Sequence, residues 1–210
     1  MLALASALLL GLLLGARHAL EPDHLVAVSV LVSRRATPGA GARLGLAWGL
    51  GHSASLLAVG CTLSVLGARL PSAASAAFEL LVAVMLLTLG GRAVVRAARG
   101  TVASPSPSSW AVVRQPLLVG VVHGLAGSGA LTAIALAGLP TLQARLAYIV
   151  LFGLGSVAGM SALAGLAGWP LARLAGARTP FRWLTAATGT LSLLVGLAWA
   201  WSALGALARS

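Results

Sequence analysis

Long apolar segments, divided by short breaks that contain arginine or proline, make up nearly the whole of this sequence. A run of about 20 apolar residues is long enough to cross the roughly 30 Å hydrocarbon core of a membrane as a helix. Charged residues form only 8% of the chain, against about 25% in soluble domains, so they are too few to cover a water-facing surface. The pattern therefore predicts an all-α integral membrane protein.

Six membrane-spanning segments are predicted, at residues 2–33, 43–68, 71–97, 114–139, 143–169 and 182–208. The first is too long for one crossing, because at 1.5 Å per residue it would extend to about 48 Å. It begins like a secretion signal, but no basic residue precedes its apolar core, so it is predicted to remain in the protein. Pro22 removes a backbone donor and clashes with the preceding turn. The first helix is therefore predicted to be kinked or broken near Pro22.

The arginines of the chain collect at alternate breaks between the segments. If the N-terminus lies outside, ten arginines are cytoplasmic and three are outside. The ten are Arg34, Arg35, Arg43, Arg92, Arg96, Arg99, Arg114, Arg173, Arg178 and Arg182, and the three are Arg69, Arg145 and Arg209. Because cytoplasmic loops carry an excess of basic residues, both termini are predicted on the non-cytoplasmic side of the cytoplasmic membrane. The net charge of +11 forms no continuous patch and predicts no nucleic acid partner.

The two halves of the chain share short motifs at matching positions. GARHAL at 15–20 corresponds to GVVHGL at 120–125, and WGLGHS at 48–53 corresponds to FGLGSV at 152–157. The offsets are 105 and 104 residues, half of the chain each time. Two halves of three spans each must have opposite orientations, which is the inverted-repeat architecture of many transporters. The predicted divisions are a first three-helix repeat at 1–99, a Pro- and Ser-rich cytoplasmic linker at 100–113 and a second three-helix repeat at 114–210.

Four histidines are predicted to lie near the middle of the membrane, namely His18, His24, His52 and His123. His52 and His123 each follow an arginine by nine residues, which corresponds to about 13 Å along a helix. Two of the three carboxylates of the chain, Glu21 and Asp23, stand beside His18 and His24 in the stretch RHALEPDH at 17–24. Histidines that merely fill the core would be spread along the helices. Ionisable groups inside a membrane usually face a site or a pathway, so a polar midplane site is predicted.

The spacing within RHALEPDH gives the proline a role. On an unbroken helix, at about 100° per residue, His18 and His24 would point about 120° apart and could not share one small ion. A break at Pro22 would turn His18, Asp23 and His24 towards one centre; alternatively, Pro22 only ends a helix and the polar residues face a water-filled vestibule. Imidazoles with a carboxylate suit nickel, cobalt or zinc, whereas copper(I) favours thiolates and magnesium or calcium favours oxygen ligands. A transported divalent metal is predicted, with no resident cofactor.

The same motifs resemble those of a known family. His-x4-Asp-His at His18, Asp23 and His24, Gly-His-Ser at 51–53 and HGLAGSGAL at 123–131 are similar to the nickel/cobalt transporter superfamily, above all to its compact branch of urease-accessory nickel permeases (UreH-like). The resemblance follows the order of the spans over most of the chain. It implies that nickel or cobalt is bound by His18, Asp23, His24 and His52. Larger members usually carry an Asp-Ala pair before the Asp-His, where this chain has ALEP, so Glu21 is a candidate replacement carboxylate.

Further polar residues are candidates for the pathway or for support of the metal ligands, namely Glu21, Ser53, His123 and Ser128. The stretch GLAGSG at 124–129 predicts an anion-binding nest, a helix interruption or a close helix-packing face. Arg17 is a candidate partner of Glu21 or Asp23. Glu79 is a candidate for proton coupling, although a buried acid bonded to a neighbouring helix is the simpler interpretation. Cys61 is assigned to packing.

The leading functional interpretation is a secondary transporter of a divalent transition metal, with uptake favoured because no His-rich loop is present and the proton gradient as the driver. The chain has no P-loop or HExxH motif, and its single cysteine excludes a dithiol carrier. The alternatives are a small-anion, sulfite-like exporter, a non-transporting accessory membrane protein for metalloenzyme assembly, and a zinc hydrolase with Glu21 as base. No enzymatic activity is predicted. The expected partners are the bilayer, the metal ion and cytoplasmic metallochaperones or urease or hydrogenase assembly factors.

Overall fold

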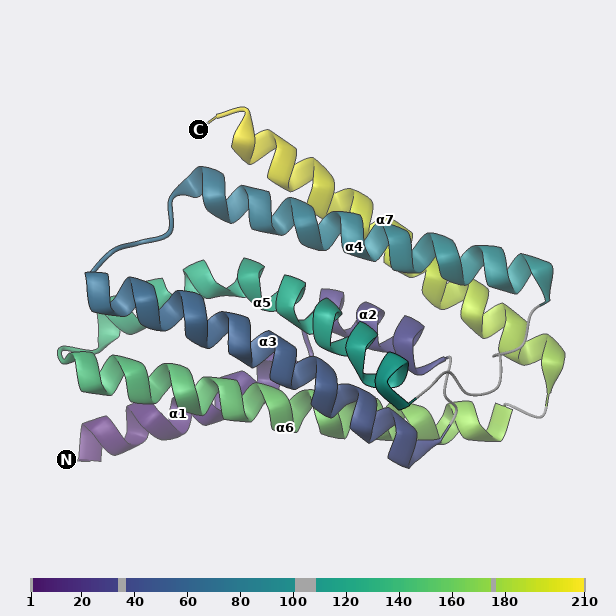
Figure 1. The fold of residues 1–210 in the computed structure, drawn as a ribbon, viewed down its shortest axis with the longest axis horizontal. Coiled ribbons are helices and arrows are strands. Elements are labelled where there is room, and N and C mark those ends of the chain that lie inside the picture. The colour runs from purple at the N-terminus through teal and green to yellow at the C-terminus, as the bar shows by residue number, and fades with distance from the viewer. Residues whose placement is uncertain (1, 34–36, 101–108, 175–176, 210) are drawn as a thin grey trace.

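The computed structural model describes residues 2–33, 37–100, 109–174 and 177–209, and the regular elements within these ranges are all helices. They are α1 (Leu2–His18), α2 (Pro22–Val32), α3 (Pro38–Leu66), α4 (Ser72–Arg99), α5 (Ser109–Gly138), α6 (Leu142–Leu174) and α7 (Arg178–Leu207), as Figure 1 shows. Five of them, α3 to α7, contain segments long and apolar enough to cross a membrane. The prediction of an all-α protein with the character of a multi-pass membrane protein is confirmed.

The first predicted span, 2–33, is two shorter apolar helices rather than one. α1 ends at His18 and α2 begins at Pro22, so the predicted break near Pro22 is confirmed. Glu21 has extended backbone angles (φ −65°, ψ 148°), as expected for the residue before a proline. Pro22 occupies the first position of α2, where its missing N–H costs no helical hydrogen bond. With 11 residues, α2 spans only about 17 Å, so it is too short to cross a membrane by itself.

Several helices begin earlier than the hydropathy pattern predicts. α3 begins at Pro38 instead of 43, α5 at Ser109 instead of 114, and α7 at Arg178 instead of 182. The predicted boundaries were set at arginines, whereas a helix continues past the apolar zone until a cap ends it. For α3 that cap is Thr37, whose Oγ1 accepts a hydrogen bond from the Ala40 amide at 3.2 Å. Most of the predicted linker at 100–113 lies outside the described residues, and its last five residues belong to α5.

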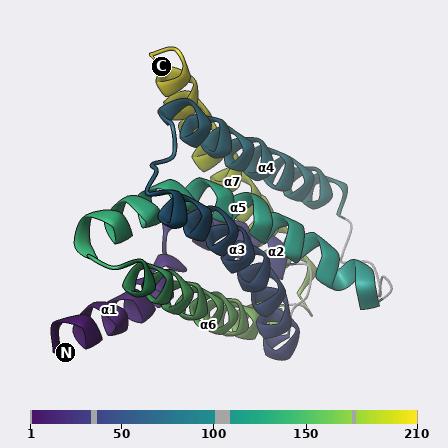
Figure 2. The ribbon, with the colours of Figure 1, turned by 60° about the vertical axis from the view of Figure 1, so that its left-hand side comes forward.

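The helices pack as a larger group and a pair. α3 packs against both α5 and α6, and α1 packs against α6, whereas α4 packs chiefly against α7 (Figures 1 and 2). The short α2 contacts both sets, and eight of its 11 residues are buried. The main core therefore forms around α2 and contains its valines together with Trp48, Leu86 and Met160.

The chain runs back and forth between two ends of the bundle. Both termini, the α3–α4 loop and the α5–α6 turn lie at one end, on the left of Figure 1, and the C-terminal ends of α2, α4 and α6 lie at the other. We call these the terminal end and the far end. Because α1 and α2 together run from the terminal end towards the far end, they occupy the course of one interrupted crossing.

Close helix packing rests on small residues, and Gly120 of α5 gives a test of it. A Cβ at Gly120 would clash with the Trp48 carbonyl oxygen of α3, whereas a Cβ at Gly91 of α4 would have no neighbour within 4 Å. We expect Gly120→Ala to lower the free energy of unfolding by about 1–3 kcal/mol. The matched change Gly91→Ala should not lower the free energy of unfolding, because alanine favours a helix more than glycine does. Thermal unfolding of the purified, detergent-solubilised proteins measures both, and equal melting temperatures would contradict this account.

Candidate metal site

The break between α1 and α2 brings the polar residues of RHALEPDH together. Two backbone hydrogen bonds stabilise the turn, from the Leu20 amide to the Arg17 carbonyl (2.8 Å) and from the Glu21 amide to the His18 carbonyl (3.1 Å). His18 thus closes the last turn of α1 while Asp23 and His24 open the first turn of α2. The ring centroids of His18 and His24 are 4.4 Å apart, which a continuous helix would not allow.

Two further histidines reach the same point from other helices. His52 of α3 lies 5.1 Å from His18 and 5.2 Å from His24 between ring centroids, and His123 of α5 stacks on His24 at 4.4 Å. His24, His52 and His123 are 1%, 0% and 2% exposed, so this cluster is closed to bulk water on most sides. All four histidines of the chain, predicted to share one depth, lie in one cluster in which each ring is close to at least two others.

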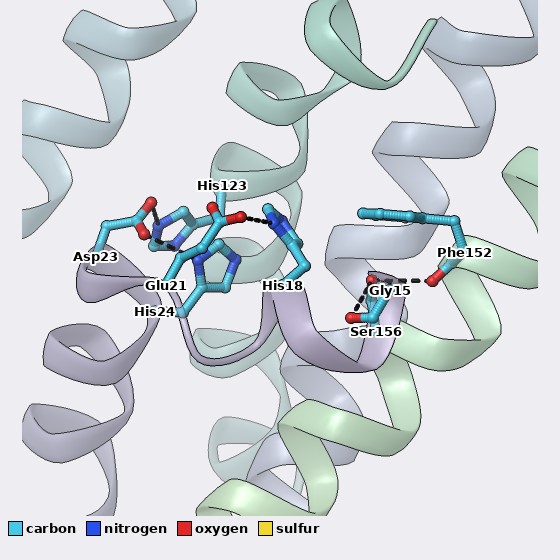
Figure 3. A network of polar contacts seen from close by, with 8 residues as sticks. All are labelled: Gly15, His18, Glu21, Asp23, His24, His123, Phe152 and Ser156. Carbon is cyan, nitrogen blue, oxygen red and sulfur yellow. Dashed lines mark hydrogen bonds and ion pairs between the residues drawn. The ribbon is translucent and has the colours of Figure 1, made fainter. Parts of the chain in front are cut away.

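Asp23 connects two members of the histidine cluster (Figure 3). Its Oδ1 accepts a hydrogen bond from His24 Nδ1 and its Oδ2 accepts one from His123 Nε2, each at 3.0 Å. Because a carboxylate offers only acceptors, these contacts place a proton on His24 Nδ1 and on His123 Nε2. The lone pairs of His24 and His123 are therefore on Nε2 and Nδ1 respectively, the arrangement by which carboxylates orient metal-binding histidines.

The remaining imidazole nitrogens have no hydrogen-bond partner among the described residues. They are His18 Nε2, His24 Nε2, His52 Nδ1, His52 Nε2 and His123 Nδ1. A buried polar atom without a partner carries a desolvation cost that a bound ligand can offset. Two triads offer ligand atoms within 4.8 Å of one another, namely His18, His24 and His52, and Asp23, His24 and His123. Ligand atoms around a small divalent ion are about 3 to 3.5 Å apart, so small side-chain rotations would close either triad on an ion.

A cavity of about 690 Å³ adjoins the cluster. His18, Asp23, His24 and His123 line its inner part, with residues of α1, α4, α5, α6 and α7 around them. Glu21 also lines it; this carboxylate is half exposed and accepts from His18 Nδ1 at 2.8 Å. The cluster is therefore reachable through a space that carries charged groups.

The other sequence candidates fall in different places. Ser53 Oγ donates to the Gly153 carbonyl of α6 at 2.8 Å, and Ser128 Oγ donates to the Leu125 carbonyl of its own helix at 2.6 Å. α5 runs unbroken through GLAGSG, and Gly124 lies against the His52 carbonyl, so this stretch is a packing face. Cys61 is half-buried and packs against an apolar cluster.

Two charged candidates line the cavity. Arg17 has no ion pair with Glu21 or Asp23 in the described part of the chain. Glu79 of α4 contacts Ser75 of its own helix, with 3.5 Å between Oε1 and Oγ, and not the neighbouring-helix partner that the sequence suggested.

Two aromatic residues at the site were not singled out from the sequence. The Trp48 ring lies 5.4 Å from His24 and 5.8 Å from His123, and the Phe152 ring lies 5.4 Å from His18. Both are the aromatic residue that precedes Gly-Leu-Gly in the repeated motif. The repeat itself was therefore the signal that could have identified them.

Comparisons with known proteins give one relationship. The chain is 32% identical to the urease accessory protein UreH of Bacillus sp. (strain TB-90) over 178 residues, covering 80% of this chain and 78% of that protein. No protein-family model matches the chain. No solved structure matches it either.

Proposed function

This chain belongs to the family of the urease accessory protein UreH, within the nickel/cobalt transporter superfamily, and we propose that it is a permease for a divalent transition-metal ion. The observation that carries the proposal is the convergence of four imidazoles and one carboxylate at a helix break, with five ring nitrogens left without a partner among the described residues. Nickel is the proposed cargo, with cobalt next, because both suit imidazole ligands and the relative is a urease accessory protein.

The proposed metal site is formed by His18, Asp23, His24 and His52. His18, His24 and His52 supply three imidazole nitrogens that lie within 4.8 Å of one another. Each of these residues has a ring nitrogen without a hydrogen-bond partner among the described residues. Asp23 completes the site by fixing the ring of His24 and by adding the negative charge that a divalent ion requires. His123, the other partner of Asp23, supports the site from α5.

The charge of the site favours a cation over the sulfite-like anion considered from the sequence. All three acidic side chains of the chain line the cavity beside the cluster, whereas Arg17 is the only arginine on its wall among the described residues. A pathway for an anion would need more positive than negative side chains on its wall. No catalytic role is proposed.

We propose that α1 and α2 together form one interrupted crossing, so that the chain crosses the cytoplasmic membrane six times with both termini outside. Among the described residues, Arg69, Arg145 and Arg209 belong to the terminal end, whereas Arg43, Arg92, Arg96, Arg99, Arg114, Arg173 and Arg182 belong to the far end. This asymmetry supports a cytoplasmic far end. The cavity adjoining the cluster lies towards the terminal end, which supports uptake from outside.

The packing supports an inverted repeat of three helices. Among the glycines at which an added Cβ would clash with a backbone carbonyl, four form the pairs Gly15–Phe152, Gly120–Trp48, Gly51–Leu117 and Gly155–Leu12. Adding or subtracting the half-chain offsets of 104 and 105 residues converts the first pair into the second and the third into the fourth. The same operation exchanges the α1–α6 contact with the α3–α5 contact. Half-repeats of this kind meet around a midplane site in many transporters.

On this proposal, the protein supplies metal for the assembly of a metalloenzyme such as urease, with a cytoplasmic metallochaperone or assembly factor as the recipient. Its similarity to a urease accessory protein supports that role.

Accumulation of radioactive nickel in cells that express the protein, compared with empty-vector cells, tests the proposal. We expect accumulation above the vector level, reduced by excess unlabelled cobalt more than by zinc. Accumulation below the vector level would keep the metal site and reverse the direction. Equal accumulation in both cell lines would overturn the permease and favour a non-transporting accessory protein.

A further inference from the structure

The acidic side chains of this protein all line one cavity. The chain has 14 arginines and only three carboxylates, Glu21, Asp23 and Glu79. The carboxylates come from different elements, the α1–α2 break, the first turn of α2 and the second turn of α4, yet all three line the cavity next to the histidine cluster. Two imidazoles that are almost fully buried, His24 and His123, line the same cavity, and each has a ring nitrogen without a partner among the described residues.

The cavity extends from the cluster towards the terminal end. Its α5 wall consists of residues that follow His123, as far as Ile134, which is about 16 Å further along the helix. Its α6 wall consists of Tyr148 and Phe152, in the first half of that helix, and its α4 wall is Glu79, seven residues after the helix begins. Several wall positions, including Ala130 and Ile134, are exposed, so the cavity reaches the molecular surface.

We propose that this cavity is the access path of the cation from the terminal end, and that Glu79 is a cation-attracting station on it, outside the ligand set. This inference rests on the proposed function and adds a residue to it. A carboxylate on a low-dielectric wall raises the local concentration of cations and their rate of arrival. Glu21 accepts from His18 Nδ1 at 2.8 Å, whereas Glu79 has a longer contact of 3.5 Å with Ser75 Oγ, which leaves its charge available to a passing ion.

Nickel uptake kinetics give the first test. Removing the charge with Glu79→Gln should raise the half-saturating nickel concentration about three- to tenfold while the maximal rate stays within about twofold, because the ligands are intact. Glu79→Asp, which keeps the charge, should behave like the wild type. Glu79→Gln should also weaken the dependence of subsaturating uptake on ionic strength. Unchanged kinetics in Glu79→Gln, or an equal loss of maximal rate in both variants, would show that Glu79 does not attract the cation on its path.

Thiol labelling tests the path without requiring metal transport. Ala130 lines the cavity and Ala137 is exposed on the same helix outside it, so each is replaced by cysteine in a Cys61→Ala background. Membrane-impermeant methanethiosulfonates of opposite charge are added outside intact cells. We expect Ala130→Cys to react from outside, with a cationic-to-anionic rate ratio that falls at least about twofold on adding Glu79→Gln. The ratio at Ala137→Cys should not change.

The two tests separate the two claims. If wild-type cells accumulate no nickel but Ala130→Cys shows the charge-dependent labelling, the nickel permease fails and the cation-attracting path stands. If nickel is transported but Ala130→Cys is unreactive from outside, or its rate ratio is independent of Glu79, the path fails and the permease stands.

Discussion

Replacing His24 by asparagine is expected to reduce nickel accumulation to the level of cells without the protein, while the protein folds normally. His24 belongs to both triads that could hold an ion, so its loss dismantles both. The amide nitrogen of asparagine takes nearly the position of His24 Nδ1, so it can still donate to Asp23 Oδ1. The variant therefore keeps the donor to Asp23 and removes Nε2, the nitrogen that has no partner among the described residues.

The measurement is nickel accumulation at matched membrane levels of protein. His24→Ala is a more disruptive variant, because it also removes a hydrogen bond from a buried carboxylate and should lower the stability of the protein. Ser192→Ala serves as a control: Ser192 is equally buried, and its Oγ donates to the Leu86 carbonyl at 2.9 Å, in a contact between α7 and α4. Full uptake by a stable His24→Asn protein would remove His24 from the ligand set.

Replacing Asp23 by asparagine should weaken nickel binding about 10- to 100-fold, the usual effect of losing a carboxylate that orients metal-binding histidines. Asparagine has one acceptor and one donor group, so it cannot accept from both His24 Nδ1 and His123 Nε2. If its NH₂ faces His24, that ring must carry its proton on Nε2, where the metal would bind. If its NH₂ faces His123, that ring must carry its proton on Nδ1, and in either orientation the negative charge beside the ion is lost.

Equilibrium binding of nickel to the purified protein measures this effect. His123→Gln is the matched comparison, because the glutamine amide can take the position of His123 Nε2 and keep its bond to Asp23. We expect His123→Gln to bind nickel within about threefold of the wild type, well short of the loss expected for Asp23→Asn. An equal loss in both variants would make His123 a direct ligand, and no loss in Asp23→Asn would remove Asp23 from the site.

The sequence was sufficient for the helical class, for the break at Pro22 and for the meeting of His18 with His24. Each follows from a local rule: the length of an apolar run, the missing N–H of proline and the 100° turn per residue. The meeting of Asp23 with His123 does not follow from a local rule, because 100 residues separate them. It depends on where α2 and α5 are placed in the bundle, and Gly120 and Gly124 help to place α5 by allowing it close to the Trp48 and His52 carbonyls of α3.

The position of Glu79 could not be predicted either. A single acid in an apolar helix shows no partner in the sequence, and the face that it presents depends on how α4 rotates as it packs on α7. The early starts of α3, α5 and α7 were missed for a different reason. Hydropathy marks where a helix leaves the apolar zone, whereas capping residues such as Thr37 mark where the helix ends.

The dual contacts of α2 have a mechanical consequence. α2 touches α4 and α7 on one side and α3 and α6 on the other, and it carries Asp23 and His24, while the other histidines belong to α1, α3 and α5 (Figure 1). If the α4–α7 pair shifted and α2 moved with it, Asp23 and His24 would move away from the other three histidines. An ion bound by residues of both sets would hold them together, so the loaded and empty proteins would differ in how readily the two sets of helices move relative to each other.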